Sequence, residues 1–150
     1  MTRHVDAATE LAENVATPFD QAQAMPVSAY TSEDFLALEQ SEIFAKSWLC
    51  AGRADALSKP GDYMTIEISG EPIIVLRDRE GDLRALSNVC RHRMSVLLEG
   101  RGNVRTITCP YHAWTYSLDG SLRGAPAMEK NGSFCKKDVS LPAIRCEEWL

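Results

Sequence analysis

The sequence predicts a mainly β domain preceded by helical segments, and three observations support this prediction. Short runs with alternating or β-branched residues follow one another closely between residues 63 and 122. Glycine-containing tight turns separate these runs. Residues 8–46 instead carry helical spacing and capping signals. We therefore expect a helical N-terminal part followed by an antiparallel β meander.

Residues 1–27 form a leader that we expect to be partly helical or disordered. Apolar residues recur in it at helical spacing: Ala8, Leu11, Ala12 and Val15. The pattern starts after Asp6 and stops at Thr17-Pro18, since proline does not continue a helix. Any helix in the leader is therefore short, and we expect its apolar side to pack on a partner subunit.

A second helix is predicted from Thr31 to about Lys46. Thr31 is a good N-cap residue, and Glu33 and Asp34 place negative charge in the first turn, where the helix dipole favours it. The buried face of this helix should consist mainly of large apolar residues: Phe35, Leu38, Ile43 and Phe44.

The strands follow in close succession. Residues 63–68 alternate in polarity, and Ile73 to Arg77 is rich in β-branched residues. Gly70 and residues 80–82 mark the tight turns that end these two strands. Residues 114–117 should pair with Leu122 across Asp119-Gly120, a strong hairpin signal.

Two loops of the meander carry metal-ligand residues. Residues 83–89 lead into the first loop and residues 104–108 into the second. The first loop contains Cys90 and His92, and the second contains Cys109 and His112. We expect both loops to end neighbouring strands, so that the two Cys/His pairs meet at one tip of the sheet.

Two thiolates and two imidazoles form a complete ligand set for a metal centre. The spacing C-x-H followed by C-x-x-H is unusual for zinc, where Cys usually pairs with Cys and His with His. It is typical of a Rieske [2Fe–2S] cluster, in which two His replace two Cys on one of the irons. Neutral imidazoles make the centre less negative than four thiolates would, so it accepts an electron more readily. A structural zinc site is the alternative interpretation of the same residues.

Residues 88–126, NVCRHRMSVLLEGRGNVRTITCPYHAWTYSLDGSLRGAP, resemble the Rieske domain of the large (alpha) subunit of the Rieske non-haem iron oxygenases, also called ring-hydroxylating oxygenases. Residues 39–52, EQSEIFAKSWLCAG, resemble the N-terminal helix and first strand of that domain. The resemblance extends over about residues 28–150. It implies a small antiparallel β-sandwich or barrel that holds a [2Fe–2S] cluster through Cys90, His92, Cys109 and His112.

The resemblance also implies partners and a reaction. The cluster would receive electrons from a reductase or ferredoxin and pass them to a mononuclear non-haem Fe(II) for O2-dependent hydroxylation of an organic substrate. In that family the iron belongs to the catalytic domain of a neighbouring subunit in a homo-oligomer. Relatives hydroxylate aromatic rings or quaternary amines, and the sequence does not choose between them.

Several positions depart from related patterns. Ser95 and Tyr111 stand where respiratory Rieske proteins have a second pair of cysteines, so the disulfide of those proteins cannot form here. Ala113 and Trp114 stand where those proteins place a hydroxyl near the cluster, which favours a potential at the lower end of the Rieske range. Met94 and Ala113 occupy positions where glycine is usual in the oxygenases.

The chain lacks the residues for a second iron site. Non-haem iron oxygenases hold their iron with two His and one carboxylate. The chain has three histidines, and only His4 remains if His92 and His112 bind the cluster. We therefore expect no catalytic residue here, and we interpret the chain as a Rieske domain truncated before the catalytic domain of a longer subunit. A stand-alone Rieske ferredoxin is the alternative, and a zinc-stabilised interaction module is a third reading.

Composition gives further expectations. The net charge of −5 does not support binding to nucleic acid. Five arginines form a solvated rim or a steering patch for an acidic electron donor: Arg91, Arg93, Arg101, Arg105 and Arg123. The N-terminal residues lack the apolar core of a secretory signal, and no membrane anchor is visible, so we expect a cytoplasmic protein. The remaining cysteines, Cys50, Cys135 and Cys146, should be buried free thiols.

Overall fold

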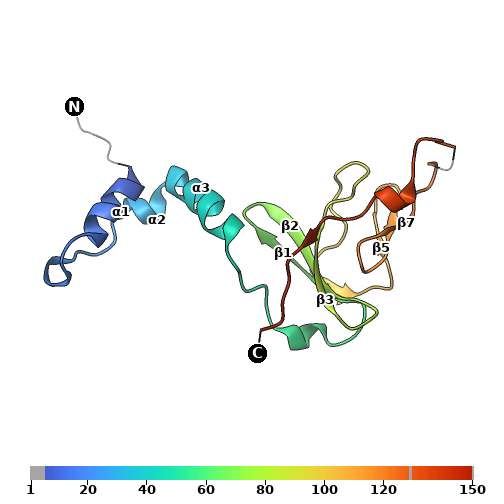
Figure 1. The fold of residues 1–150 in the computed structure, drawn as a ribbon, viewed down its shortest axis with the longest axis horizontal. Helices are drawn as coiled ribbons and strands as arrows, with labels where there is room; N and C mark the ends of the chain where they lie inside the picture. The colour runs from blue at the N-terminus through green and yellow to red at the C-terminus, as the bar shows by residue number, and fades with distance from the viewer. Residues whose placement is uncertain (1–5, 129, 150) are drawn as a thin grey trace. The chain divides into compact units, whose positions relative to one another are not determined.

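The structure is a computed structural model that describes residues 6–128 and 130–149 (Figure 1). The chain divides into two compact units, Met1–Leu49 and Cys50–Leu150. The first unit contains the helical segments, and the second contains all the strands. In the described residues, no helix is long and apolar enough to cross a membrane.

The N-terminal unit starts with the predicted short helix. Helix α1 spans Ala7–Val15, and the Asp6 side chain caps it by accepting a hydrogen bond from the Thr9 amide at 2.9 Å. A 3-10 helix at Phe19–Gln21 follows Pro18. Met1 to Val5 of the expected leader lie outside the described residues. The helical part of the leader prediction thus agrees with α1, while its boundary at residue 27 stays a prediction.

The second predicted helix is divided into three pieces. Helix α2 spans Ser28–Thr31, helix α3 spans Glu33–Glu42, and a 3-10 helix covers Phe44–Lys46. Thr31 was the wrong cap, because it is the last residue of α2 and its hydroxyl donates to the Val27 carbonyl. Ser32 has the extended backbone that a cap requires, and its hydroxyl accepts from the Phe35 amide at 3.1 Å.

The expected buried face of this helix is not observed in the described residues. Leu38 and Ile43 are exposed, whereas Phe35 and Phe44 are half-buried. The ten residues of α3 do not gather their apolar side chains on one face, so the helix has no continuous apolar face to bury. Within the N-terminal unit only Ala7 is buried among the described residues.

The C-terminal unit contains two antiparallel sheets (Figure 1). The first has the strand order β4-β1-β2-β3-β8, with bounds β1 Asp62–Ile68, β2 Glu71–Arg77, β3 Leu83–Ser87, β4 Arg101–Asn103 and β8 Ala143–Ile144. The second has the order β5-β6-β7, with bounds β5 Ile107–Thr108, β6 Thr115–Tyr116 and β7 Leu122–Gly124. Two 3-10 helices, Ala54–Leu57 and Lys136–Asp138, complete the unit. The mainly β prediction is confirmed.

The β1–β2 hairpin forms where the sequence predicted it. Ile68 pairs with Glu71, which leaves Ser69 and Gly70 as a two-residue turn. Both turn residues have positive φ, 51° and 81°, as a type I′ hairpin turn requires.

The turn between β2 and β3 is held by a buried carboxylate. Asp78 is 1% exposed and accepts hydrogen bonds from the amides of Glu80 and Asp82 and from Nε of Arg84. Burial alone would raise the pKa of Asp78, but the ion pair with Arg84 and the amide donors outweigh it and lower that pKa. The turn therefore depends on an ionised side chain.

Alternate residues of β2 supply two separate cores. Ile74 and Leu76 belong to the larger core, which also contains Cys90 and Cys109, the two candidate ligand cysteines. Ile73 and Val75 point to the smaller core on the other side of the sheet. The larger core lies beneath the loops that carry the candidate ligands.

Two expectations about the strands were wrong. The two ligand loops do not end neighbouring strands, because β3 lies in the five-stranded sheet and β5 in the three-stranded sheet. Residues 48–52, the end of the segment 39–52 in which the resemblance implies a first strand, have irregular conformation. In the described residues this segment has no partner strand, and an extended segment without a partner is not stable as a strand.

Candidate metal centre

The first ligand loop, Cys90 to Ser95, closes through two backbone hydrogen bonds. The Met94 amide donates to the Cys90 carbonyl at 3.0 Å, and the Cys90 amide donates to the Ser95 carbonyl at 2.8 Å. Met94 adopts φ = 54°, which turns the chain back on itself. The Cys90 and His92 side chains are therefore held on a closed turn.

The second loop, Cys109 to Trp114, repeats the same closure. The Ala113 amide donates to the Cys109 carbonyl at 3.1 Å, and the Cys109 amide donates to the Trp114 carbonyl at 2.8 Å. Ala113 has φ = 55°. Met94 and Ala113 thus occupy equivalent left-handed positions, which explains why glycine suits both. The two loops have the same length, but His follows Cys by two residues in the first and by three in the second.

Both candidate thiol ligands lie in the protein interior. Cys90 is 0% exposed and Cys109 is 3% exposed. Burial alone would raise the pKa of Cys109, but hydrogen bonds from the Tyr111 and His112 amides, and from the Cys90 and Ser95 side chains, lower it. The loop thus favours the thiolate, which is the form that binds metal.

Tyr116 connects the first loop to the core. Its hydroxyl lies 3.3 Å from Cys90 Sγ and accepts a hydrogen bond from the Arg91 amide at 3.0 Å. Tyr116 is fully buried, and burial together with the contact to Cys90 raises the pKa of its hydroxyl. Because the hydroxyl stays protonated and its oxygen accepts from Arg91, its proton is free to point at the Cys90 sulfur.

The imidazoles of His92 and His112 lie against each other, with ring centroids 4.8 Å apart and planes at 65°. His92 stacks in parallel on Trp114, at 4.7 Å and 4°, and His112 stacks on Tyr111 at 3.7 Å and 27°. Both imidazoles are half-buried. Burial, followed by the charges of His112 and Arg93, lowers the pKa of His92. His92 is therefore held in the neutral form that binds metal.

The four side chains are arranged as two pairs. Among residues 6–128 and 130–149, no three His, Cys, Asp or Glu side chains surround a single ion position. The thiols form an inner pair and the imidazoles an outer pair. A Rieske cluster requires this division, with two Cys on one iron and two His on the other.

One ring nitrogen shows that the site fits such a cluster. Nδ1 of His112 is buried and has no hydrogen-bond partner among the described residues. Buried polar atoms in folded proteins nearly always have partners. A lone pair on an imidazole nitrogen beside a thiolate is the donor that iron binds. The residues present therefore fit a [2Fe–2S] cluster.

Comparison with protein families identifies the domain. The Rieske [2Fe-2S] domain family matches residues 47–144, which include both ligand loops. The chain belongs to the Rieske family. Its cofactor is accordingly a [2Fe–2S] cluster, as the motif predicted.

Individual relatives give the same assignment. The oxygenase subunit of carnitine monooxygenase from Acinetobacter baumannii is 40% identical over 146 residues, which are 97% of this chain and 39% of that protein. The crystal structure of the quaternary ammonium Rieske monooxygenase CntA with L-carnitine is similar, with a TM-score of 0.78 and 43% identity over 83% of this chain and 36% of that one. Naphthalene 1,2-dioxygenase from Rhodococcus sp. has a TM-score of 0.79 at 30% identity, over 92% and 31% of the two chains. This chain spans about two fifths of its curated relatives or less.

The structure also places the remaining residues singled out in the sequence. All five arginines of the predicted rim are exposed, and Arg91 and Arg93 flank His92. His4 lies outside the described residues. The thiols of Cys50, Cys135 and Cys146 are free, but the expectation that they are buried was wrong: Cys50 and Cys135 are exposed and Cys146 is half-buried.

Sequence reasoning missed the role of Tyr116. A signal for it was present, because alternate residues of a strand face the same side, and Tyr116 follows the buried Trp114 by two residues. Hydrogen bonding to Cys90 could not be predicted, since the two residues lie 26 positions apart.

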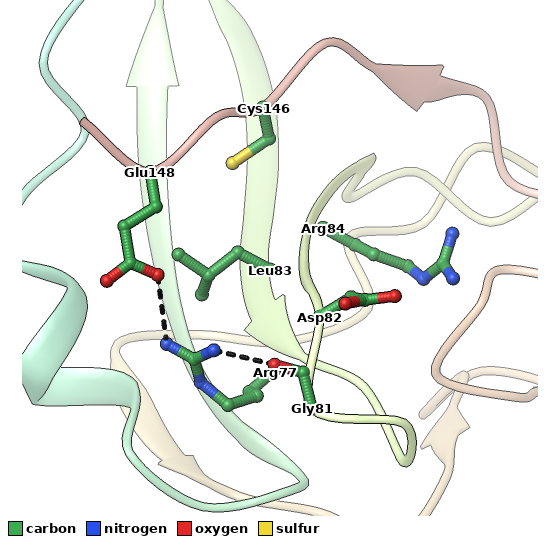
Figure 2. Close-up of a pocket in the computed structure, with 7 residues that line it drawn as sticks. All are labelled: Arg77, Gly81, Asp82, Leu83, Arg84, Cys146 and Glu148. Carbon is green, nitrogen blue, oxygen red and sulfur yellow. Dashed lines mark hydrogen bonds and ion pairs between the residues drawn. The ribbon is translucent and has the colours of Figure 1, made fainter. Parts of the chain in front are cut away.

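An open pocket of about 400 Å³ lies away from the ligand residues (Figure 2). Arg77 crosses it, donating to the Gly81 carbonyl at 2.6 Å and pairing with Glu148 at 3.7 Å. Cys146 also lines it, and burial raises the pKa of this thiol. The pocket shares no residue with the two ligand loops, and the charge of Arg77 is already balanced.

Proposed function

We propose that this chain is the electron-transfer domain of a Rieske-type oxygenase subunit, with Cys90, His92, Cys109 and His112 as the ligands of its cluster. The observation that carries the proposal is the pairing of two buried thiols with two half-buried imidazoles on loops of matching backbone geometry. When bound, the cluster supplies reversible one-electron transfer.

The surroundings of the ligands define a direction for electron exchange. Cys90 and Cys109 are buried in the core, whereas His92 and His112 are half-buried, and His112 stacks on Tyr111, which is 59% exposed. Electron exchange with partners therefore takes place on the imidazole side.

An oxygenase subunit is favoured over a stand-alone carrier. The alignment with carnitine monooxygenase covers 97% of the chain, so it includes most of the helical unit before residue 50 as well as the Rieske domain. A carrier would need only the domain itself. The domain boundaries at 1–27 and 28–150, and a catalytic domain with mononuclear Fe(II) beyond them, are part of this proposal.

The relatives support a proposal for the substrate class. Identity is 40–43% to proteins that act on carnitine or other quaternary ammonium compounds and 30% to a naphthalene dioxygenase. We therefore propose monooxygenation of a quaternary ammonium compound rather than dioxygenation of an aromatic ring.

Two partners belong to the proposal. The first is a reductase or ferredoxin that delivers electrons, and the exposed Arg91 and Arg93 beside His92 favour one with an acidic surface. The second is the catalytic domain of a neighbouring subunit, as in a homo-oligomer. A cytoplasmic location also stays a prediction.

Turnover in the complete subunit tests this function. With a reductase and O2, the protein should consume one or more of carnitine, choline and glycine betaine, and leave naphthalene unchanged. Cys109→Ser should abolish substrate-dependent O2 uptake, whereas Cys135→Ser, an exposed cysteine outside both loops, should retain it. Consumption of naphthalene alone would contradict the substrate class, and full activity of Cys109→Ser would contradict the electron-transfer role.

A further inference from the structure

Trp114 carries a buried N–H group that has no partner among the described residues. Its side chain is 4% exposed, and Nε1 makes no hydrogen bond to protein atoms. An indole N–H buried in this way costs free energy unless an acceptor satisfies it. The only other buried side-chain atom in this condition is Nδ1 of His112, two residues away, in the part of the chain that the structure describes.

The position of Trp114 restricts where the acceptor can lie. Its ring stacks in parallel on His92 of the first loop, and its own backbone carbonyl closes the second loop on Cys109. On another side the indole packs against Phe134, with ring centroids 5.5 Å apart. Trp114 thus contacts both ligand loops, and solvent does not reach its nitrogen. The acceptor must belong to the site.

The two unpartnered nitrogens differ in chemistry, and this difference assigns each a partner. An imidazole nitrogen offers a lone pair, so Nδ1 of His112 suits iron. An indole nitrogen only donates, so it cannot bind iron. The acceptors that a [2Fe–2S] centre provides are its sulfides and its cysteine sulfurs.

We propose that Nε1–H of Trp114 donates a hydrogen bond to a sulfur atom of the cluster. This inference rests on the proposed function, because it requires the cluster to be held by these loops. Trp114 then has two roles as a positioning residue. It fixes the plane of the His92 imidazole, and its N–H stabilises the reduced cluster, which carries more negative charge on sulfur.

Trp114→Phe separates these roles, because phenylalanine can stack on His92 but has no N–H. In the iron-loaded protein, the equilibrium constant for one-electron reduction by a reference dye should fall about fivefold, from the net strength of one hydrogen bond. At 59 mV per tenfold change this is a decrease of about 40 mV in midpoint potential. Trp149→Phe is the matched control, since Trp149 is 88% exposed, and it should leave the potential unchanged.

Pulsed EPR on the reduced protein labelled with 15N-indole tryptophan gives a further readout. Its isotropic 15N coupling requires a hydrogen bond to the cluster, whereas stacking alone gives only a through-space dipolar coupling. A 15N coupling to the cluster is expected in the wild type and in Trp149→Phe, and it should vanish in Trp114→Phe. If Trp114→Phe does not retain a cluster, the presence or absence of the 15N coupling in the wild type and in Trp149→Phe still tests the hydrogen bond. A wild-type protein with an intact [2Fe–2S] spectrum but no 15N coupling overturns this inference alone, whereas a wild type without a [2Fe–2S] spectrum overturns the proposed function.

Discussion

Tyr116→Phe should lower the midpoint potential of the cluster. The Tyr116 oxygen accepts from the Arg91 amide at 3.0 Å, so its own proton is available to Cys90 Sγ at 3.3 Å. Phenylalanine preserves the buried ring and removes this donor. The change therefore removes one hydrogen bond to a ligand sulfur, together with the acceptor of the Arg91 amide.

The size of the effect follows from that bond. A hydrogen bond to a charged group is worth about 1.5–3 kcal/mol, and only the part that differs between the oxidised and reduced forms affects the potential. Taking this part as about 1 kcal/mol gives a decrease of about 40 mV, since about 1.4 kcal/mol corresponds to 59 mV for one electron. Because the Arg91 amide also loses its acceptor, the free energy of unfolding of the variant should be about 1 kcal/mol lower than that of the wild type.

A redox titration monitored by the EPR signal of the reduced cluster measures this shift. Tyr30→Phe is the control, because Tyr30 is 73% exposed and belongs to the N-terminal unit, and its potential should equal that of the wild type. If Tyr116→Phe carries an intact cluster at an unchanged potential, the hydroxyl does not donate to Cys90 and the reasoning is refuted.

Three further changes have defined outcomes. Ala113→Gly should raise the free energy of unfolding by about 0.5–1 kcal/mol, because glycine adopts φ = 55° without strain. Ala56→Gly, in a 3-10 helix, is the control and should lower the free energy of unfolding. Chemical denaturation measures both values. Asp78→Asn should cost about 2 kcal/mol near neutral pH through loss of the ion pair with Arg84. Since the pKa of Asp78 is lowered in the folded state, this difference is present above about pH 4 and should shrink as pH falls through the folded-state pKa; a cost independent of pH contradicts the ionised role. His112→Cys should lower the midpoint potential, because a thiolate adds negative charge to the centre, and an unchanged potential with an intact cluster counts against His112 as a ligand.

The ligand residues and the first hairpin could be predicted from the sequence because their signals are local. Ser69-Gly70 forms a turn between two patterned strands, and the two Cys/His pairs have a spacing that few sites share. Met94 and Ala113 were noticed as departures from glycine, but their left-handed backbone was not predicted.

Other features depend on distant partners and could not be predicted. Strand β4 is exposed throughout and becomes a strand only by pairing with β1, through Tyr63 and Gly102 among others. The separation of β3 and β5 into two sheets has no local sequence signal. The stacking of His92 on Trp114 likewise joins two loops that are distant in sequence. The cap at Ser32 was missed for a different reason, because two adjacent hydroxyl residues are equally good candidates and the break between α2 and α3 decides between them.

The central claim is that two buried thiols and two half-buried imidazoles hold a [2Fe–2S] cluster. Metal and sulfide analysis of the anaerobically purified protein, combined with EPR after reduction, tests it most directly. The claim predicts a red-brown protein with about two irons and two sulfides per chain and a Rieske EPR signal on one-electron reduction. Cys90→Ser should lose the colour, the iron, the sulfide and the signal together, whereas Cys50→Ser should retain all four. A colourless protein that binds stoichiometric zinc, with no acid-labile sulfide, would contradict it.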